Sequence, residues 1–108
     1  MQLSEKNCVP CEGGVKPFTR QEAKRYLKQV NGWFIIRKEI EKEFKFKDFK
    51  EALGFINKVG DIAEEEDHHP DIYLHSYKRV KITLSTHAIK GLSENDFILA
   101  AKIDKIVE

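Results

Sequence analysis

Hydrophobic residues recur at helical spacing in three segments of the chain. The first follows a capping box, Thr19-Arg-Gln-Glu22, with apolar side chains at positions 23, 26, 27 and 30 before Asn31-Gly32 ends it. The second follows a potential N-cap, Asp48, and has apolar residues at positions 49, 52, 53, 56, 59 and 63. The third follows another capping box, Ser93-Glu-Asn-Asp96, and covers residues 97–107. Each pattern predicts an α-helix.

Between these helices the pattern changes to the two-residue period of β-strands. Residues 33–36 form an apolar run and residues 40–46 alternate loosely, with a turn expected near Lys38-Glu39. Residues 72–77 and 80–87 alternate on either side of a turn at Lys78-Arg79. The order α-β-β-α-β-β-α predicts an α+β fold, in which a four-stranded antiparallel sheet is covered by helices on one face.

The first seventeen residues show no hydrophobic period and contain Pro10, Gly13, Gly14 and Pro17. We therefore expect a flexible leader over residues 1–17, followed by a single domain over residues 18–108. A chain of 108 residues fits one domain but is too small to enclose a deep cavity. An active site would be shallow, or shared between subunits.

The net charge and the lengths of the apolar runs limit which partners and which cellular location we expect. Nineteen Lys and Arg against eighteen Asp and Glu give a net charge of +1, which argues against the basic surface of a nucleic-acid binder. No apolar run approaches the roughly eighteen residues of a membrane span, and residues 1–7 lack the apolar core of a signal peptide. We expect a cytoplasmic protein with no nucleic-acid or membrane partner.

The two cysteines, Cys8 and Cys11, have Cys-x-x-Cys spacing. A structural zinc site needs four nitrogen or sulfur ligands, and the second half of such a motif is missing. A redox motif of this kind belongs beside a βαβ unit, which the pattern does not predict. We favour a reduced pair in the leader over a metal site or a redox site.

All four histidines lie between positions 68 and 87, namely His68, His69, His75 and His87. Histidine can both give and take a proton near neutral pH, so the cluster is a candidate for acid–base catalysis. Pro70 disfavours the α conformation at His69, so the second helix should end close to the histidine pair. If that helix extends this far, Glu64 lies one turn before His68 and can orient or charge it.

Each candidate also has an ordinary structural explanation. The histidine pair suits an exposed polar turn, and His87 suits a solvated strand end. The capping box accounts for Asp96. Trp33, the sole tryptophan, suits the core.

The candidates fall at defined spacings from one another. The string Glu64-x3-His68-His69-Pro70-x6-Tyr77-x9-His87-x8-Asp96 resembles the signature of the pterin-4a-carbinolamine dehydratases, and the likeness extends over about residues 17–104. Six residues separate Pro70 from Tyr77 where some members of that family have five, so a bulge could turn Tyr73 toward the site instead. His75 matches no position of the signature and is interpreted as a surface residue.

The resemblance implies a hydro-lyase, 4a-hydroxytetrahydrobiopterin dehydratase. Such an enzyme eliminates water from a 4a-hydroxytetrahydropterin to give the quinonoid dihydropterin, and so recycles the pterin cofactor of aromatic amino acid hydroxylases. The step needs placed acids and bases, and we expect neither a cofactor nor a metal.

The resemblance also assigns roles to residues. His68 and His87 would transfer protons, and His69 would bind and position the pterin. Three further residues would complete the site: Glu64, holding polar ring atoms or an imidazole, Asp96, supporting His87, and Trp33, lining the pocket.

A homodimer or homotetramer is expected, because an exposed sheet edge invites pairing with a second copy. Two alternatives remain beside the enzyme. One is a metal site built from the histidines and cysteines, whose spacing fits no common zinc pattern. The other is a binding module, since some animal relatives serve as dimerisation partners of a transcription factor.

Overall fold

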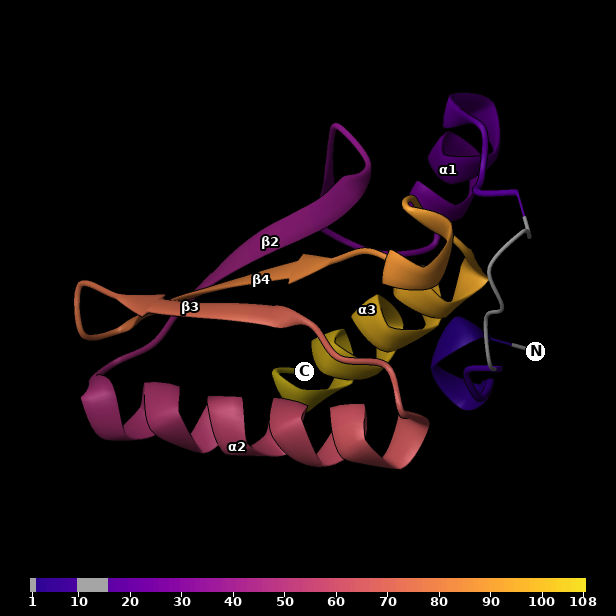
Figure 1. The fold of residues 1–108 in the computed structure, drawn as a ribbon. Coiled ribbons are helices and arrows are strands. Elements are labelled where there is room, and N and C mark those ends of the chain that lie inside the picture. The colour runs from indigo at the N-terminus through magenta and orange to yellow at the C-terminus, as the bar shows by residue number, and fades with distance from the viewer. Residues whose placement is uncertain (1, 10–15) are drawn as a thin grey trace.

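A four-stranded antiparallel sheet is the frame of the fold (Figure 1). The computed structural model describes residues 2–9 and 16–108. The strands lie in the spatial order β1-β2-β4-β3, and their bounds are Phe34–Ile36 for β1, Glu39–Lys45 for β2, Asp71–His75 for β3 and Arg79–Leu84 for β4. The helices are α1 (Arg20–Leu27), α2 (Phe49–Glu66) and α3 (Glu94–Ile106), with short 3-10 helices η1 (Leu3–Glu5) and η2 (His87–Ile89). This architecture confirms the predicted α+β fold.

The three α-helices begin at the N-caps that the sequence predicted. Thr19 Oγ1 accepts the Glu22 N–H at 3.2 Å, and Glu22 Oε1 accepts the Thr19 N–H at 2.9 Å, which completes the capping box of α1. Asp48 Oδ1 accepts the Glu51 N–H at 2.8 Å at the start of α2. A second capping box, between Ser93 and Asp96, starts α3. In the part of the chain that the structure describes, no helix is both long and apolar enough to cross a membrane.

Both hairpins form, but their turns lie earlier in the chain than predicted. The first turn is at residues 37–38, where Arg37 takes a left-handed φ of 57°. The second covers residues 76–78, with φ of 50° at Ser76 and 52° at Tyr77. Since left-handed residues cannot continue a strand, β3 ends at His75 rather than at the predicted residue 77.

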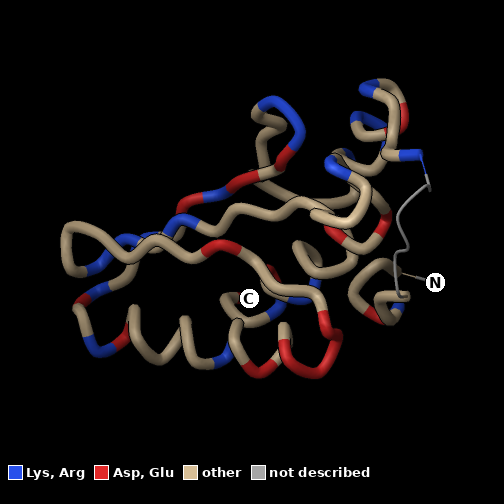
Figure 2. Tube along the Cα trace, in the orientation of Figure 1, with Lys and Arg blue, Asp and Glu red and all other residues tan. Residues whose placement is uncertain are grey.

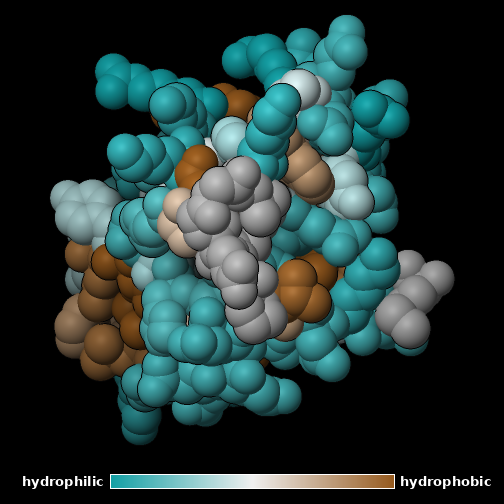
Figure 3. Space-filling model, turned by 45° about the vertical axis from the view of Figure 1, so that its right-hand side comes forward, coloured by the Kyte–Doolittle hydropathy of each residue, from teal (hydrophilic) through white to brown (hydrophobic). Residues whose placement is uncertain are grey.

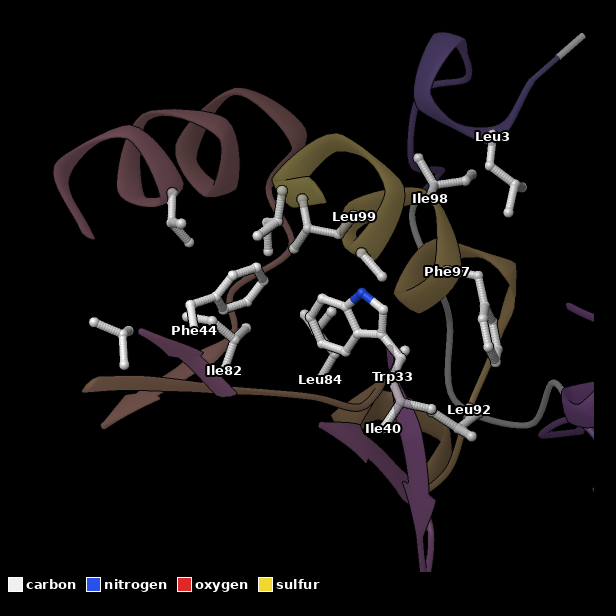
Figure 4. Packing of buried hydrophobic residues seen from close by; sticks show 14 of the residues in the cluster. Leu3, Trp33, Ile40, Phe44, Ile82, Leu84, Leu92, Phe97, Ile98 and Leu99 are labelled. Carbon is white, nitrogen blue, oxygen red and sulfur yellow. The ribbon is translucent and has the colours of Figure 1, made fainter. Parts of the chain in front are cut away.

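The core lies between one face of the sheet and the helices α2 and α3 (Figure 4). Along β4, Val80, Ile82 and Leu84 are fully buried and alternate with residues that face the open side, as a two-residue period requires. Phe97, Leu99 and Ile103 of α3 are fully buried on the helical side.

The N-terminal residues differ from the expected leader. Residues 2–9 do not extend away from the domain, because η1 packs on α3 and Leu3 is only 5% exposed. Lys102 Nζ donates to the Ser4 carbonyl at 3.1 Å, and Lys6 Nζ donates to Glu94 Oε2 at 2.9 Å. A buried leucine and the side chains of Lys6 and Lys102 are among the contacts that hold the segment, and none of these leaves a periodic pattern in the sequence.

Candidate active site

A pocket of about 490 Å³ gathers three of the four histidines, His68, His69 and His87. Its size is in the range of small-molecule sites. The other residues that line it come from the N-terminal segment, the end of α2, the segment after β4 and the start of α3: Cys8, Val9, Glu66, Asp67, Ser85, Thr86, Ala88 and Asn95. The structure thus brings together the three histidines that the sequence singled out for chemistry.

The end of α2 presents the first two histidines. Asp67 takes a left-handed conformation with φ of 50°, and its N–H and that of His68 both donate to the Ala63 carbonyl. The helix therefore ends at Glu66, close to the predicted position before Pro70. The chain then turns, so that His68 and His69 leave the helical spacing.

This ending changes the predicted partner of Glu64. The helix would have to reach His68 for Glu64 to orient that histidine, and α2 ends at Glu66. Glu64 does contact an imidazole, but it is that of His69. Glu64 Oε2 lies 2.5 Å from His69 Nε2. Both side chains are largely exposed, and His69 lines the pocket whereas Glu64 does not.

A buried carboxylate holds His68. Asp96 is fully buried, and its Oδ1 lies 2.7 Å from His68 Nε2. Its Oδ2 accepts from Thr86 Oγ1 at 2.8 Å and from the Ser93 N–H at 3.0 Å. The expected pairing of Asp96 with His87 is wrong, since the capping box fixes this carboxylate at the third position of α3, in contact with His68.

The donor and the acceptor of each side-chain hydrogen bond around Asp96 can be assigned. The hydroxyl of Thr86 has a single proton and donates it to Asp96, so Ser93 Oγ donates to Thr86 Oγ1 at 2.8 Å. A carboxylate only accepts, so Nε2 of His68 carries a proton, and Nδ1 is the ring nitrogen left for proton exchange. Nothing in the sequence identified Thr86 as a partner, whereas Ser93 was recognised only as a cap.

His87 lies on a small closed loop rather than at the end of a strand. Strand β4 ends at Leu84, and two backbone hydrogen bonds between Thr86 and Gly91 close the loop that contains η2. A Cβ at Gly91 would lie 2.5 Å from Pro17 Cβ, so only glycine fits this approach. The side chain of His87 is exposed, and within residues 2–9 and 16–108 its ring has no polar partner.

Trp33 does not line this pocket, so the expected substrate contact is wrong for this residue. It is buried in the core with its ring edge toward Phe44 (Figure 4), and its Nε1 donates to both carboxylate oxygens of Asp104 at 3.1 Å. Neither Tyr73 nor Tyr77 lines the pocket: Tyr73 is exposed on the open face of the sheet, and Tyr77 is in the turn after β3.

His75 lies apart from the other three histidines, on the open face of the sheet. Its Nε2 lies 2.6 Å from Glu43 Oε1, and its ring stacks on that of Tyr73. The hydrogen bond from His75 lowers the pKa of Glu43. The interpretation of His75 as a residue outside the site agrees with this position.

Acidic residues gather at the end of α2, beside the histidines (Figure 2). Glu64, Glu65, Glu66 and Asp67 follow one another there, and the carbonyl end of the helix dipole adds to their negative potential. This side of the pocket favours a ligand edge that donates hydrogen bonds.

Metal-ligating residues are not clustered in the described residues. No three His, Cys, Asp or Glu side chains of residues 2–9 and 16–108 are placed to hold a metal ion. Cys11 lies outside the described residues. Cys8 lies in the pocket wall, and its N–H donates to Glu66 Oε1 at 2.7 Å.

Comparisons with known proteins agree on one family. The profile of the family described as Pterin 4 alpha carbinolamine dehydratase matches residues 16–106. A protein of Alkaliphilus metalliredigens is 53% identical over 105 residues, covering 95% of this chain and 94% of the relative. One of Halorhodospira halophila is 50% identical over 108 residues, covering 98% of both chains. Both bear the name "Putative pterin-4-alpha-carbinolamine dehydratase".

Solved structures show the same fold. The crystal structure of a transcriptional coactivator/pterin dehydratase from Brucella melitensis has a TM-score of 0.81 at 36% identity, covering 86% of this chain and 100% of that chain. A pterin dehydratase-like protein described as a RuBisCO assembly factor in the alpha-carboxysome has a TM-score of 0.56 at 23% identity, covering 68% of this chain and 84% of that chain. At that identity the second likeness concerns the fold alone.

Proposed function

This chain belongs to the pterin-4a-carbinolamine dehydratase family, whose members are hydro-lyases, and on that premise we propose how its own residues carry out the dehydration. The observation that carries the proposal is the gathering of His68, His69 and His87 in one pocket, with His68 held by the buried Asp96. The substrate in this proposal is a 4a-hydroxytetrahydropterin, and the products are the quinonoid dihydropterin and water.

The reaction requires two proton transfers. The C4a–O bond breaks as the hydroxyl takes a proton and leaves as water. A base takes the proton on N5, and the electron pair of the broken N5–H bond forms the C4a–N5 double bond. Placed imidazoles suit both transfers, because they exchange protons near neutral pH.

His68 is one proton-transfer group in this proposal. Asp96 fixes its ring and places a proton on Nε2, which leaves Nδ1 to accept a proton from the substrate. The negative carboxylate stabilises the imidazolium that forms when it does. The Thr86 hydroxyl and the Ser93 N–H hold this carboxylate in turn, so the buried charge has its hydrogen bonds satisfied.

His87 is the other proton-transfer group, placed on the loop after β4 with an exposed ring. His69 binds and positions the pterin, and Glu64 fixes the orientation of the His69 ring. The pyrimidine edge of a pterin carries N–H donors, and the part of the pocket that suits them is the acidic end of α2, where Glu66 and Asp67 line it.

We propose two further features of the function. The first is that the dehydratase serves an aromatic amino acid hydroxylase, whose spent cofactor is the 4a-hydroxy compound. The second is that the protein works as a homodimer or homotetramer, since neither edge strand, β1 or β3, pairs with a further strand among residues 2–9 and 16–108.

Stopped-flow dehydration of a 4a-hydroxytetrahydropterin tests the catalytic proposal. We expect His68→Ala and His87→Ala each to lower kcat by about 10²- to 10⁴-fold, and the double variant to approach the uncatalysed rate. His69→Ala should mainly raise KM. His75→Ala is the matched control, because this fourth histidine lies outside the pocket, and it should keep kcat within about twofold.

Two results would contradict the proposal. A wild-type rate equal to the uncatalysed rate would exclude the dehydratase activity for this chain. Unchanged kcat in both His68→Ala and His87→Ala, with pterin binding retained, would favour a binding module over an enzyme.

A further inference from the structure

The N-terminal segment forms part of the wall of the histidine pocket. Cys8 and Val9 line the same pocket as the three histidines, although nearly sixty residues of sequence separate them from His68. The resemblance in sequence assigns no role to these positions. The contacts of the segment show whether its place there is fixed.

The side-chain amide of Asn95 hydrogen-bonds to both the N–H and the carbonyl of Val9, as the backbone of a neighbouring strand would. Its Oδ1 accepts the Val9 N–H at 3.0 Å, and its Nδ2 donates to the Val9 carbonyl at 2.6 Å. Asn95 is only 4% exposed, and it precedes Asp96 in the first turn of α3. One buried amide therefore fixes Val9 relative to the residue that holds His68.

A second tether acts one residue earlier. The Cys8 N–H donates to Glu66 Oε1 at 2.7 Å, and the side chain of Glu66 is only 5% exposed. Lys102 Nζ lies 3.7 Å from the other oxygen of Glu66. Buried and partly buried partners on α2 and α3 thus position the backbone of residues 8–9.

Val9 is nevertheless exposed, although it lines the pocket. It is 65% exposed, which makes it one of the most exposed large apolar side chains among the described residues. Apart from Ala88, the other side chains that line the pocket are polar, charged or sulfur-containing. A fixed backbone with an open apolar side chain is what a flat heteroaromatic ligand needs against one of its faces.

We propose that Val9 is a substrate-binding residue that packs against the pterin ring, and that Asn95 is the positioning residue that holds it there. This inference rests on the proposed function for the identity of the ligand. It adds a specificity element that comes from outside the histidine signature.

Equilibrium binding and turnover of Val9 variants test the contact. Binding is measured by titration with 7,8-dihydrobiopterin, which has the ring system but no 4a-hydroxyl. We expect Val9→Ser to raise the Kd for this pterin and the KM for the 4a-hydroxy substrate by roughly 3- to 10-fold, with kcat within about twofold.

Val107→Ser is the matched control. Val107 is also an exposed valine, at 45%, but it lies at the end of α3 and does not line the histidine pocket. We expect its Kd and KM to equal those of the wild type. Equal values for Val9→Ser and the wild type would overturn the inference.

A double-variant cycle tests the role of Asn95. Asn95→Asp keeps an acceptor for the Val9 N–H but replaces the donor that faces the Val9 carbonyl. If Asn95 acts by positioning Val9, the Val9→Ser effect on Kd should shrink to less than about twofold in the Asn95→Asp background. A purely structural role of Asn95 would leave the Val9→Ser effect unchanged, and that result would overturn the assignment of Asn95.

Failure of the inference and failure of the proposed function give different results. Pterin binding that depends on Val9, without turnover by the wild type, would reject the dehydratase alone. Full turnover with no effect of Val9→Ser would reject the pocket-wall contact alone.

Discussion

A carboxylate beside an imidazole decides which ring nitrogen carries the proton. In His68 the carboxylate of Asp96 places this proton on Nε2. Its second oxygen, Oδ2, is fixed by hydrogen bonds from the Ser93 N–H and the Thr86 hydroxyl. The same side chain closes the capping box of α3. The buried Asp96 carboxylate therefore both caps α3 and holds His68. Replacing it with an amide of the same shape separates the two roles.

Asp96→Asn should lower kcat by about 10²- to 10⁴-fold, the range for an acid–base residue held in the wrong tautomer. The amide oxygen must stay on the Ser93 and Thr86 donors, so the NH₂ group faces His68 Nε2 and moves the ring proton to Nδ1. Stopped-flow kinetics measures the loss.

Glu43→Gln is the control for this prediction, because Glu43 contacts Nε2 of His75 in the same way outside the pocket. It should leave kcat unchanged. A normal kcat in Asp96→Asn would mean that Asp96 acts only as a helix cap.

The sequence identified the residues of the site better than it identified their hydrogen-bond partners. His68, His69 and His87 were singled out by residue type and by the resemblance to the family signature, and the structure places all three in one pocket. The partner of Asp96 could not be read, because the pairing with His68 spans 28 residues and depends on how α2 and α3 pack. Trp33 was misassigned because its ring is buried in the core and its indole N–H donates to the partly buried Asp104.

The helices and strands could be predicted where a local signal marks them. Capping residues such as Thr19 and Ser93 place helix starts correctly, because the hydrogen bonds that define them span only three residues. The loop with η2 was missed, since the bridge from Thr86 to Gly91 and the contact of Gly91 with Pro17 have no periodic signal. The attachment of η1 was missed for the same reason.

An ion pair joins the segment after η1 to the first turn of α3. Lys6 donates to Glu94 Oε2, and the Tyr26 hydroxyl donates to the same oxygen at 3.1 Å. The hydrogen bond from Lys6 lowers the pKa of Glu94 below its ordinary value of 4.5, with a smaller contribution from Tyr26. The same bond raises the pKa of Lys6 above 10.5.

Lys6→Met should lower the Tm at pH 7 by no more than about 3 °C, as expected for an exposed pair. A carboxyl whose pKa is depressed on folding stabilises the protein above its ordinary pKa of 4.5 and loses this effect as the pH falls below it. The Tm difference between variant and wild type should therefore vanish in acid.

Melting curves from pH 3 to pH 7, followed by circular dichroism, provide the measurement, with Lys24→Met as control. Among the described residues Lys24 has no carboxylate partner, so its Tm difference should not depend on pH. A Lys6→Met difference that is constant from pH 3 to pH 7 would rule out the ion pair as a stabilising contact.

In the part of the chain that the structure describes, several large apolar side chains of α2 and of the edge strand β3 are exposed. Strands β1 and β3 are the two edges, and β3 is the longer, with five residues. Phe49 and Leu53 of α2 and Ile72 of β3 are 48%, 40% and 37% exposed. Figure 3 shows a hydrophobic patch on the side of the molecule where α2 and β3 lie. A second copy related by a twofold axis would cover both the free strand edge and this patch.

Leu53→Glu should therefore convert an oligomer into a species near the monomer mass of 12.6 kDa. A carboxylate buried at the centre of an apolar interface has no partner, and its desolvation opposes association. Size-exclusion chromatography with light scattering measures the mass. Val107→Glu, at an exposed valine beyond α3, should retain the wild-type mass. A monomeric wild type, or a Leu53→Glu variant of unchanged mass, would show that this face is not the interface, and the pocket would then have to function within a single copy.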